Sequence, residues 1–375
     1  MTYLTRRSFV TGLGGTMALA GVPPPMGVAA SRREFWVSAQ GDGPQRYGLA
    51  WIDTDGQSPR SLPSGFRGHA VIQHGLRRES VVMLARRPGT RGIEIDLATG
   101  RTVRDFECGQ SRHLFGHGCF SNDGSVLFTS EADIKAGVGK IVVRDASDYR
   151  VLDEWSSYGI GPHELALLPD GNTLVVANGG ILTRPDSGRQ RLNILTMRSS
   201  LAYLDSSSGK RIDQFEMAEP KASIRHLDVA SDGSVAFAIQ LQRDAAGHNR
   251  PVPLAGVQRP GEGLTLFDAP ESLLHALRDY IGSVAVCHES RIAAFASPRG
   301  SLAAFWDLDT DELLGYHRLR DVCGLAFSPQ RKAFVLSNSF GEMRELDATT
   351  LDERRSRRTQ HASLRWDNHL TVISG

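Results

Sequence analysis

The chain has 375 residues, with 43 Lys and Arg against 42 Asp and Glu, and a formal net charge of +1 at pH 7. This balance gives no support for a nucleic-acid partner or for binding to an anionic membrane surface. The four cysteines, Cys108, Cys119, Cys287 and Cys323, show no C-x-x-C spacing. A thiolate metal site or a dithiol redox motif is therefore not indicated, and we expect buried free thiols.

The N-terminal residues 1–30 have the features of an export signal. Arg6 and Arg7 precede a weakly apolar, Gly-rich stretch, and Val28-Ala29-Ala30 offers small residues for cleavage. The order of these features predicts a twin-arginine signal peptide, and the apolar stretch is too short to span a bilayer. We therefore expect a periplasmic mature chain, residues 31–375, with no membrane span after removal of the signal.

Short strand-type runs bounded by Gly, Asp, Asn and Pro recur along the mature chain, without long helical periodicity. Four such runs make a unit, and Asp-Gly turns such as Asp170-Gly171 join the first run to the second. The pattern predicts an all-β fold, a seven-bladed β-propeller. Its innermost strands are predicted to start near His69, His117, His163, His226, Val284, Cys323 and His369.

Two further features of the repeat can be predicted. The last run, residues 369–373, has no successors, so we expect the N-terminal runs 34–38, 47–53 and 59–62 to complete its blade and close the ring. The third strands are predicted to end at the acidic residues that precede polar turns, namely Asp145, Asp205, Asp268, Asp307 and Asp347.

The predicted blades bring polar residues to one end of the central channel. The inner-strand starts supply His69, His117, His163, Glu164, Arg225, His226 and His369. The ends of the second strands add Ser130, Glu131, Asp133, Asn178, Gln240 and Asn338. Because both positions lie at the same end of a blade, we expect these residues to share a channel mouth.

Two long basic loops follow second strands in adjacent predicted blades. Residues 179–200 carry Arg184, Arg189, Arg191 and Arg198, and residues 242–263 carry Arg243, His248, Arg250 and Arg259. Loops of this length are usually functional or disordered. They are either a basic lid over the channel mouth or solvated surface insertions.

The recurrent histidines have two interpretations. Imidazole suits divalent iron, copper and zinc, so the cluster predicts a possible divalent metal at the channel mouth. A residue that recurs in blade after blade can instead serve the repeat by locking neighbouring blades. No H-E-x-x-H, Gly-x-Ser-x-Gly or Cys-x-x-Cys-His motif is present, so no catalytic residue is assigned.

Several motifs together resemble a known family. They are Gly116-His117-Gly118, Gly161-Pro162-His163-Glu164-Leu165, Val176-Ala177-Asn178-Gly179-Gly180-Ile181, Arg225-His226-Leu227, Cys323-Gly324-Leu325-Ala326-Phe327-Ser328 and Trp366-Asp367-Asn368-His369. Nearly the whole mature chain resembles the domain-of-unknown-function 1513 family. The resemblance implies a seven-bladed, exported propeller associated with imelysin-type iron-regulated proteins and a di-haem oxidoreductase-like protein. It carries no established catalytic residues.

Three functions remain open from the sequence. The first is a periplasmic binding or scaffold propeller in iron or other metal uptake, with a metal complex or metal-uptake proteins as partners. The second is a metal-dependent enzyme of oxidoreductase or lactonase-like type, the latter with Glu131, His163, Asn178 and Asn338 as candidate ligands. The third is a purely structural interaction propeller, because propellers host many unrelated functions.

Overall fold

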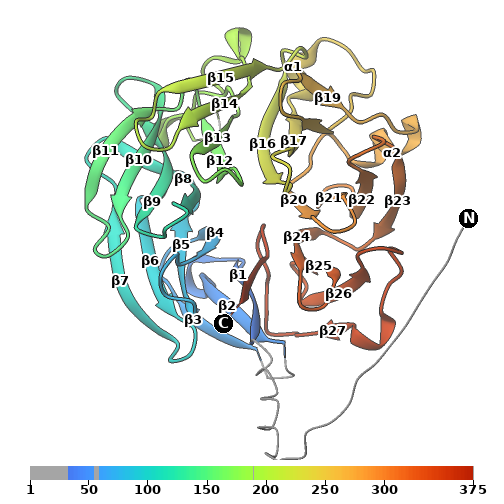
Figure 1. The fold of residues 1–375 in the computed structure, drawn as a ribbon, viewed down its shortest axis with the longest axis horizontal. Helices are drawn as coiled ribbons and strands as arrows, with labels where there is room; N and C mark the ends of the chain where they lie inside the picture. The colour runs from blue at the N-terminus through green and yellow to red at the C-terminus, as the bar shows by residue number, and fades with distance from the viewer. Residues whose placement is uncertain (1–32, 55–58, 189, 375) are drawn as a thin grey trace, which may run out of the picture. The chain divides into compact units, whose positions relative to one another are not determined.

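The strands form seven antiparallel four-stranded sheets, which surround a central axis as the blades of a propeller (Figure 1). The computed structural model describes residues 33–54, 59–188 and 190–374, so the predicted signal segment lies outside the described residues. The described residues belong to one compact unit of the chain, Arg33–Gly375. The all-β, seven-bladed prediction is confirmed.

The blades, each taken from the axis outward, are as follows. Blade 1 contains β28 (Thr371–Ser374), β1 (Glu34–Gln40), β2 (Gly48–Asp53) and β3 (Arg60–Pro63). Blade 2 contains β4 (Gly68–Gln73), β5 (Ser80–Ala85), β6 (Arg91–Asp96) and β7 (Arg101–Glu107). Blade 3 contains β8 (Arg112–Phe120), β9 (Val126–Asp133), β10 (Val138–Asp145) and β11 (Val151–Ser156). Blade 4 contains β12 (Pro162–Leu167), β13 (Thr173–Asn178), β14 (Ser200–Asp205) and β15 (Arg211–Glu216).

The remaining three blades follow the same order. Blade 5 contains β16 (Ala222–Val229), β17 (Val235–Leu241), β18 (Ala255–Gln258) and β19 (Leu264–Leu266). Blade 6 contains β20 (Ser283–Cys287), β21 (Ile292–Ser297), β22 (Leu302–Asp307) and β23 (Leu313–Arg318). Blade 7 contains β24 (Val322–Ser328), β25 (Ala333–Asn338), β26 (Glu342–Asp347) and β27 (Thr359–Gln360). Among the described residues only α1 (Arg243–Ala246) and α2 (Glu271–Ala276) are α-helical.

Blade 1 combines both ends of the described chain, as predicted. Strand β28 pairs with β1 antiparallel, with Phe35 opposite Ile373 and Trp36 opposite Val372. The pairing closes the ring, because the innermost strand of this blade comes from the C-terminus and its other three strands come from the N-terminal part.

The core lies between neighbouring blades. One cluster of buried residues joins Val37 and Leu49 of blade 1 to Val81 and Met83 of blade 2. The second strand of blade 2, β5, is buried along its whole length, whereas its outermost strand, β7, is almost entirely exposed. Burial of these blade faces against each other removes apolar surface from water and so holds the ring together.

The third strands end as predicted in four blades, at Asp145, Asp205, Asp307 and Asp347. In blade 5 the prediction was wrong, because the third strand is β18 and Asp268 follows the fourth strand, β19. The segment 242–263, predicted to be a loop, therefore contains both α1 and β18. Strand β18 is only four residues long and weakly apolar, and it lies among prolines. Because proline is uncommon within strands, the sequence pattern did not predict a strand here.

Candidate functional site

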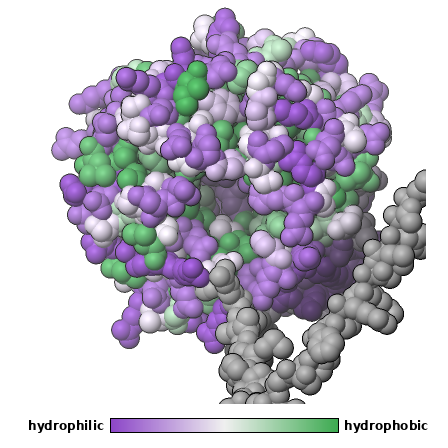
Figure 2. Space-filling view, in the orientation of Figure 1, coloured by the Kyte–Doolittle hydropathy of each residue, from purple (hydrophilic) through white to green (hydrophobic). Residues whose placement is uncertain are grey.

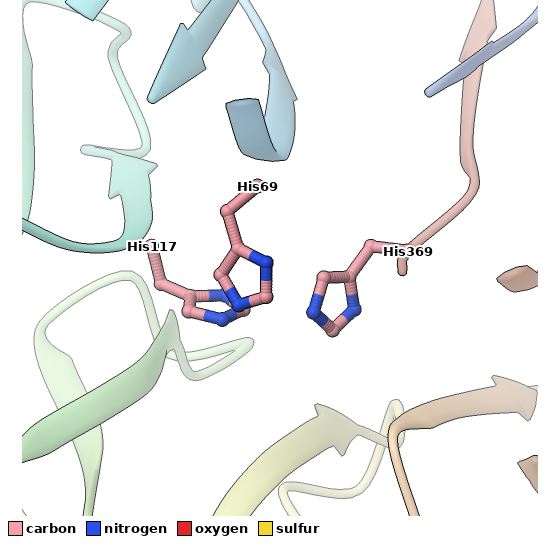
Figure 3. Close-up of side chains that lie close together, drawn as sticks. All are labelled: His69, His117 and His369. Carbon is pink, nitrogen blue, oxygen red and sulfur yellow. The ribbon is translucent and has the colours of Figure 1, made fainter. Parts of the chain in front are cut away.

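Five histidines from five blades meet at the centre of the ring and are named here the five-histidine cluster. They are His69 in β4, His117 in β8, His163 in β12, His226 in β16 and His369, two residues before β28. Their rings form a closed circuit with centroid distances of 4.7, 4.6, 4.8, 4.6 and 4.7 Å in that order, the last returning from His369 to His69. Figure 3 shows three of these rings turned toward one another.

Local irregularities in the inner strands accompany the histidines. The pairing register shifts between Gly68 and Val71, between Leu114 and Gly118, between Pro162 and Leu165, and between Ile224 and His226. In the two blades that contribute no histidine to the cluster, β20 pairs with β21 in regular register, whereas β24 also shows a shift, between Val322 and Gly324. A β-bulge re-aims a side chain that simple alternation would direct elsewhere. The bulges beside these four histidines therefore re-aim their side chains, but a bulge by itself does not mark a histidine position.

Backbone conformation also serves the cluster. Gly116 has φ +94°, and a Cβ atom at this position would lie 2.7 Å from Cβ and from Cδ2 of His69. His369 itself has φ +70°, a conformation that non-glycine residues rarely adopt. Its carbonyl accepts a hydrogen bond from Ser38 Oγ at 2.7 Å. Such strain persists where the surrounding structure holds it, commonly at functional sites.

The histidine rings are buried without satisfying their nitrogen atoms. Four of the five residues are at most 8% exposed: His69, His117, His226 and His369. Within the five-histidine cluster, four buried ring nitrogens have no hydrogen-bond partner among the described residues, namely Nδ1 of His69, Nε2 of His117, Nδ1 of His163 and Nε2 of His369. An unsatisfied buried polar atom costs about 1–3 kcal/mol. A group of four at one place indicates a ligand that completes them.

Glu164 orients two of the imidazoles. One of its oxygens, Oε1, lies 3.5 Å from Nδ1 of His117, and the other, Oε2, lies 3.2 Å from Nδ1 of His226. Oε2 also accepts a hydrogen bond from the backbone N–H of Leu227 at 3.1 Å. A carboxylate on Nδ1 places the proton there and leaves Nε2 as the lone-pair donor, an arrangement common behind metal-binding histidines.

Burial favours the neutral form of four of the five imidazoles. It lowers the pKa of His69, His163 and His369 well below the ordinary value, and the neighbouring imidazoles lower it further. Burial also lowers the pKa of His226 to about 4, against the opposing effect of Glu164. Burial raises the pKa of Glu164, but His117 and His226 outweigh it and hold that pKa well below its usual range. Neutral imidazoles with free lone pairs are the form that binds metals.

The cluster fits a transition-metal ion. Two groups of three ligand atoms lie within 4.8 Å of one another, from His69, His117 and His369 and from His117, His163 and His226. Nitrogen ligands about 2.0–2.1 Å from a tetrahedral zinc ion are about 3.3 Å apart, so small side-chain rotations would close either group around an ion. In the described residues no Asp, Glu or Cys belongs to a three-ligand group, and an all-imidazole set suits zinc, copper, iron or nickel.

A cavity of about 830 Å³ opens above the cluster, with His69, His163 and His226 in its lining. The predicted residues Arg184, Arg191, Arg225 and Gln240 also line it. Figure 2 shows the molecule hollowed at the centre of the ring. The two long segments meet beside this cavity, where Arg191 donates hydrogen bonds to Gln242 at 3.1 Å and to Asp244 at 2.7 Å.

Other predicted site residues lie elsewhere. Glu131 forms a buried ion pair with Arg144 at 2.6 Å, between β9 and β10. Asn178 donates a hydrogen bond to the carbonyl of Ser157 at 2.8 Å, and Asn338 donates to that of Arg320 at 3.0 Å. The structure therefore does not gather the lactonase-like ligand set of Glu131, His163, Asn178 and Asn338 around one position.

The other loop and strand-end candidates have structural partners or fall outside the described residues. Arg250 pairs with Glu219 at 2.9 Å, and Arg198 pairs with Glu216 at 3.1 Å. Ser130 Oγ donates to the carbonyl of His117 at 3.2 Å, which supports the cluster indirectly. Arg189 lies outside the described residues.

Sequence reasoning missed several residues of the cavity. Arg86, Arg87 and Arg299 come from loops after the second strands of blades 2 and 6, which are the equivalents of the two long loops. Their position in the repeat was the available signal, but a short loop gives no sign of function in its own sequence. Tyr280, which precedes β20, also lines the cavity.

Comparison with solved structures supports the fold. Hydrazine synthase of Kuenenia stuttgartiensis is similar with a TM-score of 0.64 and 13% sequence identity, over 81% of this chain and 90% of that one. At this identity the likeness concerns the fold alone. None of the curated proteins compared with the chain matches it. Residues 62–373 match the family described as protein of unknown function DUF1513, and the chain therefore belongs to the DUF1513 family.

Proposed function

We propose that this chain is a metal-binding propeller whose five-histidine cluster holds a divalent first-row transition-metal ion. The observation that carries the proposal is the group of buried, unpartnered ring nitrogens on four of the five histidines, which come from four different blades and lie in one closed circuit of rings. Neutral imidazoles that lack hydrogen-bond partners and lie in mutual contact are poorly explained as packing alone, because each unsatisfied nitrogen costs stability. A shared metal ion would satisfy several of them at once.

The alternative role of the histidines, locking blade to blade, is performed in this region by carboxylates. Glu164 of β12 accepts the N–H of Leu227 in β16. Asp228 of β16 in turn accepts the N–H of Val286 in β20 at 2.8 Å. Each acid therefore bonds the inner strand of the following blade, and the rings of His69 and His163 are not needed for that purpose.

The proposal also includes a cellular location and a biological process. The Arg6-Arg7 segment supports twin-arginine export, and we propose that the chain acts in the periplasm in the uptake or handling of iron or another metal. Within the described residues no helix is both long enough and apolar enough to cross a membrane. A periplasmic metal-uptake protein as partner belongs to the same proposal.

Metal analysis of protein purified after native export tests the site. We expect about one transition-metal ion per chain, and loss of that ion when His117, His163 and His226 are all replaced by Gln. A matched control replaces His275 and His288, which are exposed and belong to no three-ligand group among the described residues. If neither wild type nor the triple variant contains metal, and the circular dichroism shows that both are folded, the proposed metal site is contradicted.

A further inference from the structure

The cavity above the five-histidine cluster has an unusual charge distribution. Among its described lining residues are seven arginines and no aspartate or glutamate; the arginines are Arg67, Arg86, Arg87, Arg184, Arg191, Arg225 and Arg299. They come from segments that are far apart in the sequence and that the ring brings to one mouth. We refer to this space as the arginine cavity.

Carboxylates behind the lining neutralise only part of this charge. Asp367 forms two hydrogen bonds with Arg67, at 2.7 and 3.0 Å, and lies 3.6 Å from Arg86. Asp244 pairs with Arg191. Three arginines therefore share two carboxylates, and the lining keeps a net positive charge.

Two lining arginines are especially informative. In the described part of the chain, no carboxylate forms an ion pair with Arg225 or with Arg299. Toward the described residues, the Arg225 side chain donates a single weak hydrogen bond, to Ser223 Oγ at 3.4 Å, and the guanidinium of Arg299 lies 4.8 Å from the ring centre of Tyr280. Guanidinium groups gathered in a hollow without counter-charges are costly unless a ligand supplies the negative charge.

The position of the arginines limits the kind of anion. Arg225 immediately precedes His226, so positive charge and imidazole ligands border the same space. The guanidinium fork matches carboxylate and phosphate groups, and a volume of about 830 Å³ is that of a small-molecule site. Carboxylate oxygens are also ligands of divalent metals. An anion held by Arg225 and Arg299 could therefore complete the coordination of a metal below it.

We infer that the arginine cavity binds a small oxyanion with two or more carboxylate groups, and that the metal reaches the five-histidine cluster as the complex of that anion. The inference rests on the proposed function for its metal half, whereas the anion half stands on the cavity alone. No bond is made or broken other than metal–ligand exchange, in which histidine nitrogens replace part of the anion's oxygen ligands.

Isothermal titration calorimetry tests the two halves separately. The probes are citrate alone, zinc chloride alone, and the preformed zinc–citrate complex, each added to metal-free protein, with inorganic phosphate as a second anion. The variants are Arg225→Gln and Arg299→Gln. The matched control is Arg318→Gln, which removes one arginine from the exposed outer strand β23, where it lies 5.5 Å from the ring centre of Tyr316.

We expect citrate to bind wild type and the Arg318 variant alike, and at least tenfold more weakly to either cavity variant, while zinc chloride binds all four proteins similarly. We also expect zinc–citrate to bind more tightly than either component. Equal citrate affinity in all four proteins would overturn the anion site and leave the metal site standing. Citrate that merely strips zinc from the protein would overturn delivery as a complex. Citrate binding with no zinc binding would instead reject the proposed function, and tighter binding of phosphate than of citrate would overturn the assignment to carboxylates.

Discussion

Replacing Gly116 by Ala should disturb the five-histidine cluster through His69. An L-residue at φ +94° costs about 1–2 kcal/mol in backbone strain, offset by less than about 1 kcal/mol through the stiffer unfolded chain. The new Cβ would lie 2.7 Å from two atoms of His69, and overpacking of this kind costs about 1–3 kcal/mol more. We therefore expect a loss of about 1–5 kcal/mol, with a midpoint of about 3 kcal/mol, in the free energy of unfolding.

Gly65 supplies the matched control. Its φ is +75°, but a Cβ there would meet no atom within 4 Å, so Gly65→Ala bears the backbone cost without displacing a neighbour. Urea unfolding should show a loss of about 1 kcal/mol for Gly65→Ala. Zinc titration should show an unchanged affinity for Gly65→Ala and an affinity at least tenfold lower for Gly116→Ala. Equal stability losses and equal zinc affinities in the two variants would refute the claim that Gly116 positions a ligand.

Three further predictions follow from the contacts of the cluster. Glu164→Gln should lower metal affinity about 10–100-fold by loosening His117 and His226, while its amide oxygen still accepts the N–H of Leu227; a metal titration that matches wild type would contradict the positioning role. Acidification should destabilise the metal-free protein, because the unfolded chain takes up a proton on His226 near pH 6.5 and the folded chain only near pH 4. The free energy of unfolding should fall by about 3 kcal/mol over that interval from His226 alone, and urea midpoints that stay constant from pH 7 to pH 4.5 would contradict a lowered pKa of His226. Glu131→Gln should lower the free energy of unfolding by about 3–5 kcal/mol, because it leaves Arg144 buried without its partner, and it should leave metal affinity unchanged. Unchanged stability with a lower metal affinity would instead indicate that Glu131 is a metal ligand.

The blade count, the closure and the convergence of the histidines could be predicted because local patterns encode them. Asp-Gly turns at Asp123-Gly124 and Asp170-Gly171 marked the hairpins, and both glycines have positive φ in the structure. The run that begins at His369 had no partner of its own along the chain, which left the N-terminal strands as the only means of closing its blade.

The orientation of the side chains could not be predicted in the same way. Each bulge beside His69, His117, His163 and His226 depends on the pairing of two strands, and a sequence pattern does not show where that pairing shifts. Glu131 illustrates the limit. Its place at the end of a second strand suggested a metal ligand, but in the structure its carboxylate is paired with Arg144.

The arginine cavity was only partly visible in the sequence for a related reason. Arg184 and Arg191 stood out because their loop is long, but Arg86 and Arg299 lie in short turns, and only the closed ring brings them to the same cavity. The proximity of these turns is a property of the assembled blades and cannot be seen in any one segment of the sequence.

Anomalous X-ray diffraction at the zinc absorption edge, on crystals of the protein loaded with zinc, tests the metal site most directly. The account predicts an anomalous peak at the centre of the five-histidine cluster, about 2.0–2.1 Å from ring nitrogens of at least three of the five histidines. Zinc bound only elsewhere, with the five rings in their present positions and no peak between them, would contradict it.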